Sequence, residues 1–145
     1  MDILKAKHTD FITLEDISGE IFESEQGIPK SLTHIDDDNN PQWWYVLDDK
    51  IIVGTICAYF EDNKCHMGRI AIIPSMRNKG IATKMIRQAL EDLFLQGVDT
   101  IYLEARDVTV HMLEKMGGKV NGEPFEFYGD ICTPVVINKR NYIEK

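Results

Sequence analysis

Positive charge is scarce in this sequence. Its 145 residues include 16 Lys and Arg against 24 Asp and Glu, which gives a net charge of −8. Proteins that bind nucleic acid or anionic membranes electrostatically need a basic face. The composition therefore argues against nucleic acid or a membrane as the main partner, and it is better matched to a cationic substrate.

Cysteine is also scarce. Cys57, Cys65 and Cys132 are odd in number and none belongs to a C-x-x-C pair, so neither a disulfide framework nor a zinc cluster is indicated. The four histidines are scattered and show no metal-ligand spacing. We therefore expect no bound metal, and reduced thiols in a cytoplasmic protein.

Long apolar runs are missing. The first ten residues carry Asp2, Lys5, Lys7 and Asp10, which is unlike a signal peptide, and no stretch approaches the ~20 apolar residues of a membrane span. There is no P-loop, no G-x-G-x-x-G and no internal repeat. With 43% hydrophobic residues the chain can bury one core. We expect a single domain over residues 1–145.

The most informative stretch that is present runs from residue 68 to residue 83. Arg69–Ile73 is short and rich in β-branched residues, which predicts a buried strand ended by Pro74. From Ile81 onward, apolar residues recur at helical spacing as far as Gly97, where a C-terminal cap is expected. A strand is thus predicted to lead through a short turn into the N-terminus of a helix.

That turn suits an anion. The first amides of a helix have no helical partner and carry partial positive charge, so several of them can bind one phosphate group. Gly80 removes a Cβ from the approach, and Arg77, Lys79 and Lys84 add positive charge. The turn predicts a pyrophosphate site. On this turn alone, the alternative that Gly80 is an ordinary turn residue stays open.

The first half of the chain is predicted to be a strand, a helix and a β-meander. The strand is Ile3–Lys7, and the helix begins near Asp10 or Thr13 and ends at Gly27. Residues 31–41 contain Asp36-Asp37-Asp38 and little that is apolar, which predicts a mobile acidic loop, either a solvated connection or an attractor of amines. Strands at 42–47 and 51–60 then lead into the central strand.

The second half is predicted to complete a mixed sheet. Thr100–Ala105 is a strand expected to return parallel to the central one, since the order strand, helix, strand favours a right-handed crossover. A short helix capped by Asp107, with Val108 facing inward, and strands at 124–128 and 135–137 follow. The predicted fold class is mixed α/β (α+β), with helices on both faces of one sheet.

Three segments carry a resemblance to a known family. Arg77–Ala82 fits the pattern R/Q-x-x-G-x-G/A, Phe22–Pro29 fits F-x-x-E-Q-G-[IV]-P, and Leu103–Arg106 is followed at the right distance by Glu114–Gly117. Together and in this order they resemble the GNAT superfamily of N-acetyltransferases, in a branch of small bacterial-type proteins. The resemblance implies a GNAT-like fold and acetyl-CoA (coenzyme A) as co-substrate.

The resemblance also implies which residues bind the cofactor. Backbone groups of the central strand would pair with the pantetheine arm, and amides of the turn would hold the pyrophosphate. The residues so implied are Ile72, Ile73, Arg77, Asn78, Lys79, Gly80, Ile81, Ala82 and Thr83.

Acetyl transfer to an amine needs a base for the ammonium proton and a proton for the departing thiolate. Glu25 and Glu104 are the candidate bases, although either is equally compatible with a surface acid. Many relatives carry a tyrosine as the acid, and in this sequence that position is Leu113. His111, Cys132 and Tyr128 are candidate substitutes, each of which also fits a purely structural role.

The function implied is transfer of an acetyl group from acetyl-CoA to a primary amine of a small molecule or a protein. The alternative is a catalytically weak acyl-CoA-binding sensor or interaction module, which the missing tyrosine at Leu113 keeps open. The acceptor depends on loops that vary freely within a fold, so the sequence leaves its identity open. It also leaves the oligomeric state open, a homodimer included.

Overall fold

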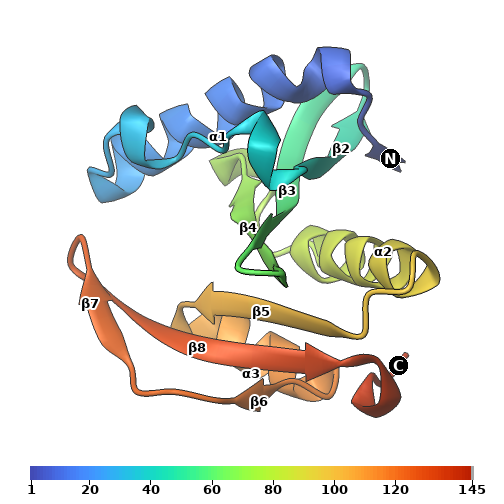
Figure 1. Cartoon of the computed structure of the whole chain (residues 1–145). Helices are drawn as coiled ribbons and strands as arrows, with labels where there is room; N and C mark the ends of the chain where they lie inside the picture. The colour runs from blue at the N-terminus through green and yellow to red at the C-terminus, as the bar shows by residue number, and fades with distance from the viewer. Residues whose placement is uncertain (145) are drawn as a thin grey trace.

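The computed structural model describes residues 1–144, and its strands form one mixed sheet (Figure 1). The strand order is β1-β2-β3-β4-β5-β8-β6, with β7 paired to β8. The strands are β1 (Asp2–Lys5), β2 (Gln42–Asp48), β3 (Ile51–Glu61), β4 (Lys64–Ile72), β5 (Thr100–Ala105), β6 (Lys119–Val120), β7 (Phe125–Phe127) and β8 (Asp130–Asn138). Only β4 and β5 pair in parallel among the described residues, which confirms the predicted crossover.

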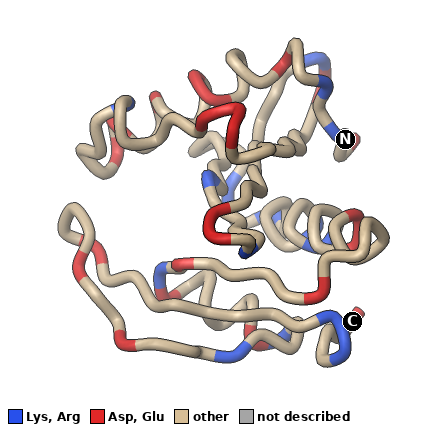
Figure 2. Tube along the Cα trace, viewed as in Figure 1, with Lys and Arg blue, Asp and Glu red and all other residues tan. Residues whose placement is uncertain are grey.

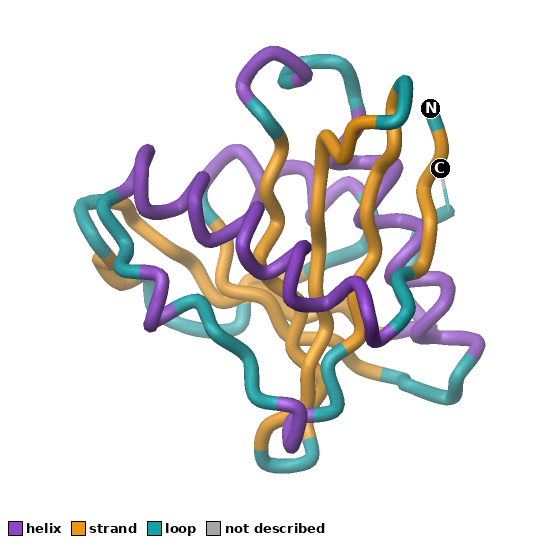
Figure 3. The backbone as a smooth tube through the Cα atoms, turned by 90° about the horizontal axis from the view of Figure 1, so that it is seen from above, coloured by secondary structure: helices purple, strands orange, loops and turns teal. Residues whose placement is uncertain are grey.

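Helices cover both faces of the sheet, as predicted. The helix α1 (Phe11–Gln26) lies across one face, and α2 (Ile81–Leu95) and α3 (Asp107–Lys115) lie on the other (Figure 3). Strand alternation separates the adjacent tryptophans: Trp43 packs with Leu14 of α1, and Trp44 belongs to the main core with α2. Within residues 1–144, no helix has the length and hydropathy needed to span a membrane.

The sheet is split at its centre. Strands β4 and β5 pair only at Cys65 with Ile101 and at His66 with Tyr102, after which they separate. Beyond this junction β4 contains a bulge, where the register with β3 shifts and Arg69 has a φ of 55°. Bulges bend a strand and increase its twist. The bend therefore leaves an unpaired edge of β4 facing away from β3.

The connection from β4 to α2 is close to the prediction. Strand β4 ends at Ile72, one residue earlier than expected. A short 3₁₀ turn (Pro74–Met76) follows, and then the turn of residues 77–80, called the glycine turn below. Gly80 has a φ of 76° at the N-cap of α2, a conformation that residues with a Cβ rarely adopt. Gly97 follows the end of α2 with a φ of 94°, as the sequence predicts.

Two local predictions are corrected. Residues 31–41 contain the 3₁₀ turn Asp37–Asn39 and a buried Ile35, and Asn39 Nδ2 donates to the Phe60 carbonyl (3.0 Å), so this segment is anchored to β3. The N-cap of α3 is Arg106 rather than Asp107, and Val108 is 78% exposed instead of buried. Both errors reflect tertiary packing that local sequence patterns do not contain.

Candidate active site

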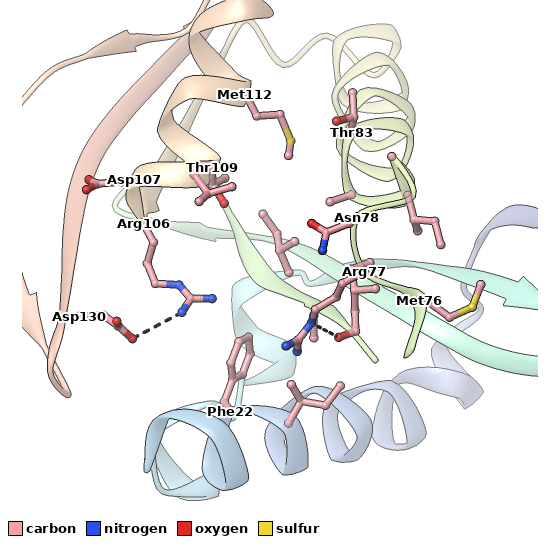
Figure 4. Close-up of a pocket in the computed structure, with 18 of the residues that line it drawn as sticks. Phe22, Met76, Arg77, Asn78, Thr83, Arg106, Asp107, Thr109, Met112 and Asp130 are labelled. Atoms are coloured by element: carbon pink, nitrogen blue, oxygen red, sulfur yellow. Dashed lines mark hydrogen bonds and ion pairs between the residues drawn. The ribbon is translucent and has the colours of Figure 1, made fainter. Parts of the chain in front are cut away.

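A cleft of about 710 Å³ opens where β4 and β5 separate (Figure 4). One wall is β4 and the glycine turn, and the opposite wall is the start of α3. The end of α1 and the β7–β8 turn close its ends. Its lining comprises Ile21, Phe22, Ile70, Ala71, Ile72, Met76, Arg77, Asn78, Gly80, Ile81, Ala82, Thr83, Arg106, Asp107, Val108, Thr109, Met112, Gly129, Asp130 and Ile131.

Most of the predicted cofactor residues lie in this cleft. Of the nine, seven line it, whereas Lys79 and Ile73 do not. The first backbone hydrogen bond of α2 runs from the Lys84 amide to the Gly80 carbonyl (3.3 Å). The amides of residues 81–83 therefore have no helical partner and stand at the positive end of the helix dipole. Their geometry fits an anion such as a pyrophosphate.

The free edge of β4 is presented by Ile72. The Ile73 amide donates to the Val53 carbonyl (3.0 Å), and the Ile73 carbonyl accepts from Met76 (2.9 Å). Because successive residues of a strand direct their backbone groups to opposite sides, the groups of Ile72 point away from β3. Its carbonyl accepts from Arg77 Nε (3.1 Å), which leaves its amide directed at the cleft.

The segments around Glu25 and Arg77, which are far apart in the sequence, meet at the cleft. Arg77 Nη2 donates to Glu25 Oε2 and Nη1 lies beside Oε1, both at 2.8 Å. The Arg77 hydrogen bond is the main cause that holds the pKa of the Glu25 carboxyl below its ordinary value. A carboxylate so engaged is a weaker proton acceptor. This contact suits Glu25 to positioning the turn better than to acting as the base. The role of Glu25 as base stays a prediction.

The other predicted base, Glu104, is exposed on β5 and does not line the cleft. It follows the junction with β4, at a position that pairs with Pro134 of β8. Its charge contributes, after burial, to raising the pKa of Tyr59 on β3 and of Cys132 on β8. Glu104 therefore lies near the junction of the two half-sheets, outside the cleft itself.

Leu113, the position at which many relatives carry the tyrosine acid, does not line the cleft. Its side chain is fully buried in the main core. The neighbouring Met112 lines the cleft and points toward Thr83 of α2 (Figure 4). The candidate substitutes His111, Cys132 and Tyr128 are absent from the lining as well.

We expect Leu113→Tyr to destabilise the fold without raising kcat. Adding a phenol to a filled core position typically costs about 1–3 kcal/mol. Urea denaturation of this variant should show that loss, while Met112→Tyr, whose side chain can extend into the cleft, should lose less. An increase in kcat for Leu113→Tyr at unchanged stability would show instead that position 113 reaches the reacting groups.

The far end of the cleft was not predicted from the sequence. There Arg106 lies 3.5 Å from Asp130, and the Phe22 ring of α1 extends between Arg106 and Arg77 (Figure 4). Arg106 belongs to a segment that carries the family resemblance. No local sequence pattern predicts Asp130 as a residue of the cleft, because its position depends on how the β7–β8 turn folds back.

Comparison with known proteins agrees with this geometry. A family model described as "Acetyltransferase (GNAT) family" matches residues 11–118. No curated protein sequence matches the chain.

Similar folds occur in solved structures from three bacteria. Escherichia coli ElaA is 14% identical, with 93% of this chain and 99% of that chain covered and a TM-score of 0.80. An acyl-CoA N-acyltransferase from Pseudomonas aeruginosa is 16% identical, with 94% and 99% covered and a TM-score of 0.78. A spermidine N-acetyltransferase from Vibrio cholerae, in complex with CoA and spermine, is 19% identical, with 97% and 96% covered and a TM-score of 0.72. At these identities the likeness shows a shared fold.

Proposed function

This chain belongs to the GNAT family of acetyl-CoA-dependent N-acetyltransferases, and we propose that it acetylates a primary amine of a cationic small molecule or a protein in the cleft between β4 and β5. The observation that carries the proposal is the continuity of the unpaired β4 edge with the open N-terminus of α2. An extended arm with an amide backbone can pair with the first, and a pyrophosphate with the second.

We assign the cofactor contacts accordingly. We propose that the Ile72 amide pairs with the pantetheine arm and that the free amides of residues 81–83 hold the pyrophosphate, whereas the Arg77 amide donates to the Pro74 carbonyl (3.4 Å). Ile73 has its amide and carbonyl engaged within the protein, so we place it in support of the strand. When bound, acetyl-CoA supplies the activated acyl group. The protein supplies an anion site, an extended binding edge and a walled cleft.

Acetyl-CoA turnover with a panel of amines tests this function. Release of free CoA thiol that depends on the amine supports it, and product mass identifies the acylated nitrogen. CoA binding by calorimetry without amine-dependent thiol release from any acceptor would favour the sensor alternative.

The acidic turn supports a cationic acceptor. Asp36, Asp37 and Asp38 form a continuous acidic stretch (Figure 2), anchored through Asn39 to the end of β3. The net charge of −8 adds to the attraction of amines. The spermidine N-acetyltransferase that shares this fold is named for a polyamine, which also favours an acceptor of this class.

Neutralising Asp36, Asp37 and Asp38 to Asn is expected to raise the acceptor KM roughly tenfold at low salt. The acetyl-CoA KM should stay the same, and the effect should fade as salt screens the charges. The matched control is the triple change of Asp2, Asp48 and Asp49 to Asn, which removes the same charge near the opposite end of β3. Equal effects of the two triple variants, or a preference for anionic acceptors, would contradict the proposal.

We further propose that residues 1–145 act as one catalytic unit in the cytoplasm. The three cysteines are free.

Burial raises the pKa of Cys65 to about 11, and it raises the pKa of Cys57 as well. Such thiols stay protonated and are poor nucleophiles, so direct transfer to the amine is favoured over a cysteine-linked intermediate.

A further inference from the structure

His66 occupies a special position on β4. It is the last residue of β4 that pairs with β5, opposite Tyr102, and the two strands separate directly after it. Its neighbours Cys65 and Met67 belong to the core beneath α2. Because side chains alternate along a strand, His66 projects from the other face of the sheet, the face on which α1 lies.

The His66 ring is held between two aromatic rings from the adjacent strands. It stacks on Tyr59 of β3, with ring centroids 5.5 Å apart and an interplanar angle of 17°. On its other side the Tyr102 ring of β5 is 5.8 Å away at 37°. These contacts fix the plane of the imidazole while leaving its nitrogens at the ring edge.

Those nitrogens are available to a ligand. His8, His34 and His111 each lie beside a carboxylate, whereas His66 has neither a hydrogen bond nor an ion pair within residues 1–144. No buried side-chain nitrogen in that range lacks a partner, so the His66 nitrogens are in contact with solvent. A half-buried imidazole with free nitrogens is suited to proton transfer.

Open space lies next to this ring. Gly68 follows His66 by two residues and therefore projects from the same face, at a point where β4 has left β5. A Cβ placed on Gly68 would meet no atom within 4 Å. The residue is not in the positive-φ region, so glycine is not required there by backbone conformation. The gap above Gly68 can accept a small group beside His66.

The charged groups around the ring come from three strands. Lys64 lies over the Tyr102 ring (5.3 Å) and Arg69 over the Tyr59 ring (5.6 Å). The charges of Glu61 and Glu104 act on Tyr59 and raise its pKa, after the larger effect of burial. The two cations are engaged with the tyrosine rings, and the two carboxylates favour a positively charged guest.

We propose that His66, which lies at the β4–β5 junction outside the cleft lining, is the base of this reaction and that the acceptor amine reaches it over Gly68, on the α1 face of the sheet. This inference rests on the proposed function. The His66 nitrogen takes a proton from the acceptor ammonium, and the freed lone pair forms the N–C bond to the acetyl carbon. The C–S bond breaks, CoA leaves as a thiolate that is protonated by water, and the amide nitrogen loses its second proton to solvent.

His66 fits this role better than the two glutamates. Glu25 is engaged by Arg77, and Glu104 is exposed on β5. Imidazole is also the side chain whose ordinary pKa is nearest neutral pH, which favours it as a base under working conditions.

The test compares His66→Gln and His66→Ala with wild type, using the best amine of the panel. We expect kcat/KM for the amine to fall about 10²- to 10⁴-fold, and CoA affinity by calorimetry to stay the same. The wild-type pH profile of kcat/KM should have an acidic limb that is absent in His66→Gln. Added imidazole should partly restore His66→Ala. His111→Gln, which changes an exposed histidine of α3 beside Glu114, is the matched control.

A second variant tests the route of entry. Gly68→Val fills the space beside His66 and is expected to raise the amine KM at least about tenfold without weakening CoA binding. Full activity of His66→Gln in an enzyme that acetylates amines would overturn the inference and leave the proposed function intact. A wild-type protein that acetylates no amine would overturn the proposed function. An unchanged amine KM in Gly68→Val would refute entry over Gly68.

Discussion

Gly80→Glu is expected to abolish CoA binding in a protein that still folds. A Cβ at Gly80 would meet no protein atom within 4 Å, so the larger side chain extends into the cleft rather than into the core. Its carboxylate would stand beside the free amides of residues 81–83 and occupy the place of the pyrophosphate. Like-charge contacts of this kind cost several kcal/mol, which corresponds to a loss of affinity of at least about 100-fold.

The controls separate charge from backbone strain. Gly80→Ala carries the cost of a positive φ without the charge and should lose little affinity. Gly97→Glu places the same side chain in a similar backbone conformation at the opposite end of α2, also in open space, and should bind CoA normally. Calorimetry with CoA, together with circular dichroism of each variant, gives the answer. Normal CoA affinity of folded Gly80→Glu would place the cofactor elsewhere.

Gly117→Ala is expected to lower the free energy of unfolding more than Leu113→Tyr or Gly97→Ala does. Gly117 follows α3 with a φ of 98°, and a Cβ there would overlap the carbonyl of Asn141 in the C-terminal segment. That segment is tied to the rest of the fold, since Ile143 donates its amide to Met116 (2.8 Å) and accepts from Arg87 (2.7 Å). Strain and displacement together should cost about 2–5 kcal/mol.

Gly97→Ala is the matched control for this loss. It has nearly the same φ, 94°, but open space around the added methyl group. Only the conformational cost remains, about 1–2 kcal/mol. Urea denaturation of both variants measures the difference. Equal losses would show that the contact with Asn141 contributes nothing to stability.

The strand, turn and helix around Gly80 could be predicted because their signals are local. A β-branched run, Pro74, a glycine turn and helical periodicity each restrict the backbone within a few residues. The mixed sheet followed from the order of elements. The family resemblance added the cofactor, which the turn alone leaves open.

The catalytic side of the site depends on packing that the sequence does not display. Adjacent helical residues point about 100° apart, so the sequence could not decide whether Met112 or Leu113 faces the cleft. No sequence motif marks His66 as a functional residue. Its position becomes meaningful only when Tyr59 and Tyr102 flank it and the strand pairing ends beside it. The contact between Glu25 and Arg77 likewise needs the folded chain.

The unpaired edge of β4 also bears on how the protein avoids aggregation. An exposed strand edge is a template onto which strands of other chains can add. Here the edge lies inside the sheet rather than at its rim, and Phe22 of α1 and Thr109 of α3 line the cleft around it. Another chain can therefore reach this edge only through the cleft between these helices. The split sheet thus keeps a binding edge open to a ligand while shielding it from neighbouring protein chains.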